Sequence, residues 1–371
     1  MAYKIFAINP GSTSTKIALF EDDICLFSKN VAHDAAELAK YSDMPAQLPY
    51  RRDMILRLLE ENDGVSLEGV DVFVGRGGGL VNIEGGVYAI DDMVLEHART
   101  CANGVVHPAT LGPQLADEFA RRFGAKAMVV NPPDTDEFQD LARMTGIKGV
   151  YRTSHLHALN LKETAIRHSH EVLGRRYEDC NYIVCHIGGG ISVSAHRRGK
   201  MVDGNDIVGG DGPMAPTRCG NVPVYGLLDY MEREHANIKT LRNLATRTGG
   251  FVNHIGISDA QELTRRAAAG DEYAAMLWNT MIYQIEKAIG SMATVLQGQV
   301  DGILLGGGMV HNPDLVHQIT ESCGWIAPVT AYPGEFEMEA MAAGAIRVLK
   351  GEETLKTYTG ERVFDGFDFA K

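Results

Sequence analysis

The chain has 371 residues and carries 48 acidic against 35 basic side chains, a net charge of −13. This length suits two domains better than one core, and 45% hydrophobic with 22% charged residues is typical of a folded protein. The acidic balance argues against a nucleic-acid partner, which needs a basic face, but not against a local nucleotide site. The 6 cysteines form no Cys-x-x-Cys pair, so we expect neither a disulfide framework nor a thiolate zinc site.

The N-terminal segment starts Met1-Ala2-Tyr3-Lys4 and leads directly into an apolar strand pattern, without the features of a signal peptide. No stretch of 18 or more residues is apolar enough to span a bilayer. We therefore expect a cytoplasmic protein that does not bind membranes.

The first half of the chain opens with three apolar segments separated by turns, which predicts an antiparallel meander. Further along, apolar runs alternate with amphipathic stretches, and Ser154 is a candidate N-cap for one of the predicted helices. We predict strands at 3–9, 16–20, 24–31, 70–74 and 127–131, and helices at 111–123 and 154–167.

The second half repeats this order. Asn9 and His186 each end the first strand of a predicted meander, and they lie 186 − 9 = 177 positions apart, near half the chain. This spacing predicts a duplication. Strands that alternate with helices indicate α/β domains with ligand sites at the carboxyl ends of strands. We predict strands at 182–187, 191–196, 200–205 and 302–305, and helices at 260–269, 273–296 and 338–349.

Glycine clusters follow several predicted strands, but no P-loop motif and no Gly-x-Gly-x-x-Gly fingerprint occurs. Residues 9–16, Asn-Pro-Gly-Ser-Thr-Ser-Thr-Lys, offer backbone N–H groups, hydroxyls and one ammonium group to a phosphate; we call them the first hairpin. Residues 186–192, His-Ile-Gly-Gly-Gly-Ile-Ser, hold the same place in the repeat and form the second hairpin. A third turn, Gly306-Gly307-Gly308, follows a later strand.

Two phosphate hairpins and a glycine shelf for a base are the pattern of the actin, sugar-kinase and Hsp70 ATPase superfamily. The first hairpin resembles the opening motif of the short-chain carboxylate kinases, the acetate and butyrate kinases. Five further segments are similar to the butyrate kinases in particular, and the resemblance runs from residue 3 to about 350: Gly75–Gly78, Asn103–Ala109, Ser154–Asn160, Asp211–Arg218 and Pro333–Glu335.

This resemblance implies an α/β fold of two duplicated ribonuclease H-like domains, of the actin and Hsp70 type, with a cleft between them. The N-terminal lobe would comprise residues 1–151 plus about 340–371 and hold the carboxylate and the first hairpin. The C-terminal lobe, 152–339, would hold the second hairpin and the adenosine site. The family also implies a homo-oligomer, at least a dimer.

The activity implied is reversible transfer of the γ-phosphoryl group of ATP to a short-chain carboxylate, with Mg²⁺ accompanying ATP or ADP. Butyrate is the expected acceptor, giving butanoyl phosphate. Acetate, propionate and branched isobutyrate are alternative acceptors, and a non-catalytic ATP-binding regulator of the same superfamily is a further alternative.

Matching positions assign roles to individual residues. Asn9 and Glu335 would hold magnesium, while Arg76 and Arg218 would be the two active-site arginines. The acyl site would include Gly78, Val106, His107 and Gly209. The predicted ATP-binding residues are Ser12, Ser14, Lys16, His186, Gly188, Gly189, Gly190, Gly306, Gly307 and Gly308.

Two positions depart from the family pattern. Asn131 stands where butyrate kinases usually have an aspartate, so Asp136 is our first choice for the active-site carboxylate and Asp134 the alternative. Tyr151 replaces a histidine of the acetate kinases, so His155 or His157 would take its catalytic place.

The implied chemistry needs no general base, because a short carboxylic acid with a pKa of about 4.3 is already ionised at neutral pH. Arginines must instead neutralise two anions as they meet. Gly78 stands where acetate kinases carry a bulky apolar residue, and the Gly209 turn is similarly bare, which predicts room for a longer acid.

Overall fold

A computed structural model describes residues 2–62 and 65–368 of the chain. The chain divides into two compact units, Met1–Asp136 with Phe336–Asp365 and Glu137–Glu335 with Gly366–Lys371. The lobe boundaries expected from the sequence, at 151 and about 339, stay a prediction. No helix in the described part is long and apolar enough to cross a membrane.

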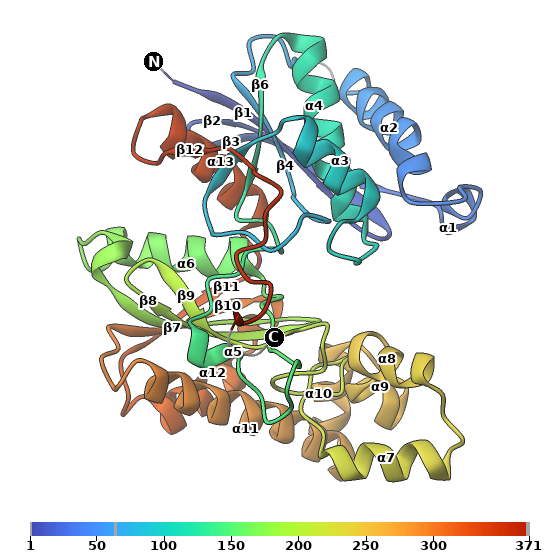
Figure 1. The fold of residues 1–371 in the computed structure, drawn as a ribbon, viewed down its shortest axis with the longest axis vertical. Helices are drawn as coiled ribbons and strands as arrows, with labels where there is room; N and C mark the ends of the chain where they lie inside the picture. Colours follow the sequence, from blue (N-terminus) through green and yellow to red (C-terminus); the bar gives the residue numbers. More distant parts are fainter. Residues whose placement is uncertain (1, 63–64, 369–371) are drawn as a thin grey trace. The chain divides into compact units, whose positions relative to one another are not determined.

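The first unit is built on a mixed sheet that has seven strands within the described residues, in the order β12-β5-β6-β4-β1-β2-β3 (Figure 1). Its strands are β1 (Lys4–Pro10), β2 (Ser14–Glu21), β3 (Ile24–Ala32), β4 (Val72–Gly75), β5 (Val87–Ala89), β6 (Lys126–Val130) and β12 (Leu355–Lys356). Its helices are α1 (Ala35–Leu38), α2 (Leu48–Glu60), α3 (Asp92–Thr100), α4 (Leu111–Phe123) and α13 (Glu337–Leu349), with 3₁₀ turns at Pro45–Gln47 and Pro108–Thr110.

The core of this unit forms because alternate residues of its central strands face the same side of the sheet. Phe6 and Ile8 of β1 lie on one face of the sheet and pack with Ile55 of α2 and Phe119 of α4. Phe73 stacks on Phe119 with ring centroids 5.9 Å apart. Helix α4 has the bounds that its amphipathic pattern predicted. This packing holds β1 and β4 side by side and parallel, so their carboxyl ends meet at one edge.

The second unit carries a mixed sheet of five strands within the described residues, in the order β11-β10-β7-β8-β9. Its strands are β7 (Asn181–Ile187), β8 (Ile191–Arg197), β9 (Lys200–Asp203), β10 (Gly302–Gly307) and β11 (Val329–Pro333). Its helices are α5 (Asp140–Arg143), α6 (Ala158–Glu171), α7 (Val224–Arg233), α8 (Ile238–Thr246), α9 (Gly250–Ile255), α10 (Ala260–Ala268), α11 (Glu272–Val295) and α12 (Pro313–Cys323), with 3₁₀ turns at Tyr177–Asp179 and Gly308–His311.

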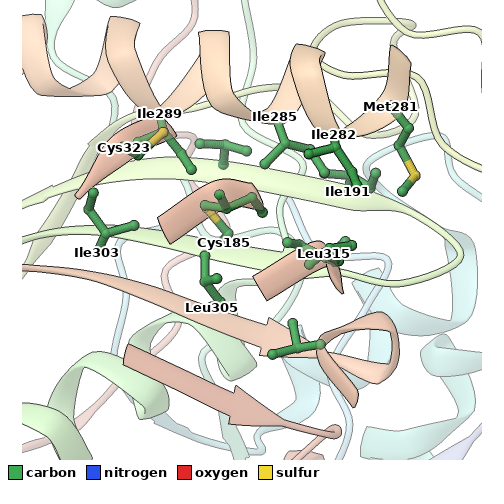
Figure 2. Close-up of a cluster of buried hydrophobic side chains, with 14 of the residues drawn as sticks. Cys185, Ile191, Met281, Ile282, Ile285, Ile289, Ile303, Leu305, Leu315 and Cys323 are labelled. Carbon is green, nitrogen blue, oxygen red and sulfur yellow. The ribbon is translucent and has the colours of Figure 1, made fainter. Parts of the chain in front are cut away.

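Helix α11 covers one face of the second sheet. Figure 2 shows Ile282, Ile285 and Ile289 pointing from this helix toward the strands that carry Cys185 and Ile303, and all five side chains are buried. Burial of each such aliphatic side chain contributes about 1.5–3 kcal/mol. The core thereby fixes β7 and β10, whose carboxyl ends carry the glycine turns.

The predicted repeat is present, because β1–β2–β3 and β7–β8–β9 are both antiparallel meanders. One predicted helix was wrong at its start. Helix α6 begins at Ala158 rather than after Ser154, because the preceding segment is not helical: His155 forms a β-bridge with Asp206, and His157 has φ −76° and ψ 56°.

Candidate active site

In the first unit, polar side chains gather where β1 and β4 end. Arg76 follows β4, and its backbone N–H donates to the Ile8 carbonyl at 2.9 Å, which brings it beside Asn9 on β1. Glu337, the first residue of α13, completes the group. Its Oε2 accepts a 2.6 Å hydrogen bond from Asn9 Nδ2, and its Oε1 lies 3.5 Å from Arg76 Nε.

The carboxylate that contacts Asn9 is therefore Glu337, and the magnesium role expected for Glu335 stays a prediction. Glu335 belongs to the second unit, where its Oε1 lies 3.9 Å from His186 Nε2. The sequence holds one signal for Glu337, its place directly before the helix predicted at 338–349. Its distance from Asn9 along the chain hides the contact.

Arg76 is 7% exposed, and its Nη1 is buried without a hydrogen-bond partner in the described structure. A buried guanidinium nitrogen with no partner costs free energy unless a ligand satisfies it. An anion bound beside Arg76 would supply that partner.

The first hairpin projects its polar groups from the same sheet. Asn9 and Lys16 are cross-strand partners in the β1–β2 register, so their side chains leave the sheet on one face. Ser12 and Lys16 are exposed and Ser14 is half-buried. The hydroxyls and the ammonium group predicted to hold phosphate are thus accessible at the end of β1.

The predicted acyl-site residues of this unit also come together. A Cβ added to Gly78 would lie 3.2 Å from the Cβ of Ala109, so Gly78 packs against the segment that follows Val106 and His107. Val106 is 65% exposed, and His107 is exposed with its Nδ1 accepting a 3.1 Å hydrogen bond from the Ala109 N–H.

Asp134 and Asp136 are each 2% exposed and have different partners. Asp134 accepts a 2.6 Å hydrogen bond from Asn103, and Asp136 accepts one of 3.2 Å from Asn82. Asn131, at φ +37°, accepts from the Gly86 N–H at 2.8 Å. Its amide thus fixes a turn, and our choice of Asp136 over Asp134 stays a prediction.

If Asp136 helps to hold Mg²⁺ through a water molecule, Asp136→Asn should lower turnover and raise the Mg²⁺ concentration needed for half-maximal activity, whereas Asp134→Asn should leave both within about twofold. Asparagine keeps the size of each side chain and removes only its charge, so the two variants control for one another. Steady-state rates measured over a Mg²⁺ titration test the ranking. The reverse order would assign the role to Asp134, and two fully active variants would remove it from both.

In the second unit, Arg218 lies directly on the second hairpin. A Cβ added to Gly190 would sit 1.5 Å from Arg218 Nη1, so only glycine permits this approach. Arg218 Nε and Nη1 are buried without hydrogen-bond partners in the described residues. Burial lowers the pKa of Arg218, the nearby Asp206 opposes this effect, and the guanidinium stays charged at neutral pH. The arrangement offers paired N–H donors to an anion on the hairpin.

The two candidate histidines occupy different settings. His157 stacks on His186 with centroids 3.9 Å apart, and its Nδ1 lies 2.8 Å from Ser192 Oγ. His155 lies elsewhere, with its Nδ1 3.2 Å from Asp206 Oδ2. Burial raises the pKa of Asp206, but contacts with His155 and two backbone N–H groups outweigh it and leave the pKa lowered. Sequence reasoning missed both Ser192 and Asp206 as histidine partners.

A cavity of about 450 Å³ lies between the second hairpin and the third glycine turn. Gly307, at φ +98°, lets the chain pass Ile187, whose carbonyl oxygen would lie 2.5 Å from an added Cβ. Gly306 pairs with His186 in the sheet rather than lining the cavity. The cavity walls include Gly188, Gly189, Gly308, Met309, Asn312, Gln261, Trp278 and Glu335.

The structure explains why position 209 is a glycine, which could not be predicted from the sequence. A Cβ there would lie 2.5 Å from Asp206 Oδ2, while the Gly209 N–H donates to Asp206 Oδ1 at 2.8 Å. The turn around Asp206 thus requires glycine. Gly209 also lines a second cavity of about 380 Å³ beside Met214 and Cys219.

Known proteins resemble this chain over most of its length. Residues 145–323 match the Acetokinase family. A probable butyrate kinase from Coprothermobacter proteolyticus is 40% identical over 96% of this chain and 100% of its own length. Butyrate kinase 2 from Clostridium acetobutylicum is 41% identical over the same shares. This chain belongs to the acetokinase family.

Solved acetokinase structures share its fold. An acetate kinase from Porphyromonas gingivalis superposes with a TM-score of 0.75 at 18% identity, covering 94% of this chain and 100% of the other. An acetate kinase from Entamoeba histolytica gives a TM-score of 0.73 at 15% identity, covering 92% and 99%. The predicted family and fold class are confirmed, and membership implies a kinase that uses ATP.

Proposed function

We propose that this acetokinase transfers the γ-phosphoryl group of ATP to butyrate and forms butanoyl phosphate and ADP reversibly. The observation that carries the proposal is a set of three buried guanidinium nitrogens without hydrogen-bond partners in the described residues, Arg76 Nη1 and Arg218 Nε and Nη1. They belong to a chain that matches a probable butyrate kinase along its whole length. Each arginine offers its unsatisfied donors to an anion, and this reaction brings two anions together.

In this proposal the chain's own groups bind and orient. Ser12, Ser14 and Lys16 bind phosphate oxygens on the first hairpin, and the glycines of the second hairpin also offer backbone N–H groups to phosphate. The carboxylate acceptor is already ionised, so Arg76 and Arg218 neutralise charge and no base is required. His157 and His186, held by Ser192 and Asn160, donate hydrogen bonds near the second hairpin.

Oxygen donors in the first unit fit a magnesium ion. Asn9 and Glu337 together provide an amide and a carboxylate, the ligand types that Mg²⁺ takes when substrate phosphates and water complete its shell. We propose that these two side chains hold it. The ion would supply charge neutralisation at the β- and γ-phosphoryl oxygens.

An assay of acyl phosphate formation tests the proposal. The protein is incubated with ATP, Mg²⁺ and acetate, propionate, butyrate, isobutyrate or pentanoate, and hydroxylamine traps the product. We expect butyrate to give the highest kcat/KM. A higher kcat/KM with another acid would replace butyrate as the proposed substrate. ATP binding without formation of any acyl phosphate would favour a non-catalytic regulator.

We predict that Gly78→Ala lowers the butyrate-to-acetate ratio of kcat/KM about fourfold, since one methylene of apolar burial is worth about 0.8 kcal/mol. Gly78 does not have a positive φ, so alanine fits its backbone. The added methyl takes volume beside Ala109 in the proposed acyl pocket. Gly290→Ala on α11, with nothing within 4 Å of its new Cβ, is the control. An unchanged ratio in folded Gly78→Ala would contradict the role.

The proposal extends to assembly and location. We propose a homo-oligomer, at least a dimer, that works in the cytoplasm. Light scattering of the purified chain measures the assembly, and a monomer at micromolar concentration would contradict it.

A further inference from the structure

Arg51 of α2 is a fully buried arginine beneath the first hairpin, with 0% of its side chain exposed. Its Nη1 donates to the Gly11 carbonyl at 2.9 Å, to Thr15 Oγ1 at 3.0 Å and to the Ser14 carbonyl at 3.4 Å. Its Nε and Nη2 donate to Gln47 Oε1 at 3.2 and 3.0 Å. The guanidinium is thus bound to the turn of the hairpin.

The positive charge of Arg51 has no acidic partner within ion-pair distance in residues 2–62 and 65–368. A buried charge without a counter-ion is costly. His33 is a titratable group near Arg51, and its pKa is lowered to about 4, first by burial and then by the charge of Arg51. His33, 2.8 Å from Thr15 Oγ1, is therefore neutral at pH 7 and neither adds to nor offsets the charge.

These contacts turn the carbonyl groups of the hairpin inward. The Gly11 and Ser14 carbonyls accept from Arg51, and the Ser14 carbonyl also accepts from the Gly11 N–H at 2.7 Å. The Thr13 carbonyl accepts from the backbone N–H of His33 at 2.9 Å. Ser12 and Thr13 are meanwhile exposed. A turn with its carbonyl dipoles directed into the protein presents an electropositive outer face, which favours anions.

We propose that Arg51 is a positioning residue for the nucleotide phosphates, because it holds the first hairpin in its anion-binding conformation and places an uncompensated positive charge directly behind it. The inference rests on the proposed role of this hairpin in binding ATP. Arg51 acts through Gly11, Ser14 and Thr15 and does not itself touch the substrate.

Two substitutions separate the charge of Arg51 from its hydrogen-bonding geometry. Arg51→Met removes both, and Arg51→Lys keeps the charge but not the planar fork of donors. By calorimetric titration without any carboxylate, we expect Arg51→Met to raise the Kd for ATP at least tenfold and Arg51→Lys to raise it about threefold. Adenosine, which has no phosphates, should bind all three proteins equally.

A control on the same helix tests for a purely structural effect. Ile55→Ala, one turn along α2 and also 0% exposed, removes core packing without touching the hairpin. We expect it to lower the Tm and leave the Kd for ATP within twofold. Equal losses of ATP affinity in Ile55→Ala and Arg51→Met would overturn the positioning role, as would a folded Arg51→Met that binds ATP like the wild type.

The outcome does not depend on the identity of the acid. If Arg51→Met does not fold, Arg51→Lys decides the matter, because wild-type affinity for ATP in that variant would show that the donor geometry has no role. If the wild type binds ATP but does not phosphorylate butyrate, the proposed function fails while the Kd values still test Arg51. If the wild type binds no ATP, both fail.

Discussion

Arg218→Ala should lower kcat with butyrate about 10³-fold while changing the Kd for ATP about threefold or less. Arginines that neutralise developing charge in phosphoryl transfer are worth roughly this much. The guanidinium rests on Gly190 with two buried nitrogens unpaired, so it is positioned for an anion on the second hairpin. Arg218→Lys should recover little, because the planar pair of donors is lost. Steady-state kinetics and ATP titration measure the two effects separately.

Arg176→Ala is the matched control for Arg218. Arg176 precedes the 3₁₀ turn Tyr177–Asp179, is exposed and pairs with Asp179 at 3.0 Å, so its loss should leave kcat unchanged. A kcat for Arg218→Ala within threefold of wild type would contradict its role, since a factor of three is only about 0.65 kcal/mol of barrier.

The scaffold of the site could be predicted from local sequence because its parts are local. A hairpin places Asn9 and Lys16 opposite one another, and the register follows from the alternation of buried side chains on β1 and β2. Glycine clusters after strands mark turns that side chains would block, as Gly190 and Gly307 do. These features depend on residues that are close in the sequence, so they can be predicted from it.

Contacts between segments that lie far apart in the sequence were harder to predict. Asn9 and Glu337 meet only because α13 packs back on the first sheet, and nothing in the spacing of two glutamates chooses between Glu335 and Glu337. The roles of Arg51 and Asp206 depend on burial and on backbone groups that they contact. Side chains that hold a turn through hydrogen bonds to its backbone follow no sequence motif, so a structure is needed to identify them.

Glu337→Gln should lower kcat about 100-fold and raise the Mg²⁺ concentration for half-maximal activity at least tenfold. The amide keeps the size of the side chain and its hydrogen-bonding capacity, but the charge that attracts a divalent ion and faces Arg76 is lost. Activity measured over a Mg²⁺ titration at fixed ATP gives both quantities.

Glu335→Gln is the natural comparison, because the sequence favours Glu335 and the contacts favour Glu337. Glu335 is 43% exposed at its side chain and lies near His186 rather than Asn9, so we expect its variant to keep the wild-type Mg²⁺ dependence. A stronger Mg²⁺ effect in Glu335→Gln would return the metal to the residue chosen from the sequence. A Glu337→Gln variant with reduced kcat but unchanged Mg²⁺ dependence would instead mean that Glu337 acts by orienting Arg76, 3.5 Å away, and not as a metal ligand.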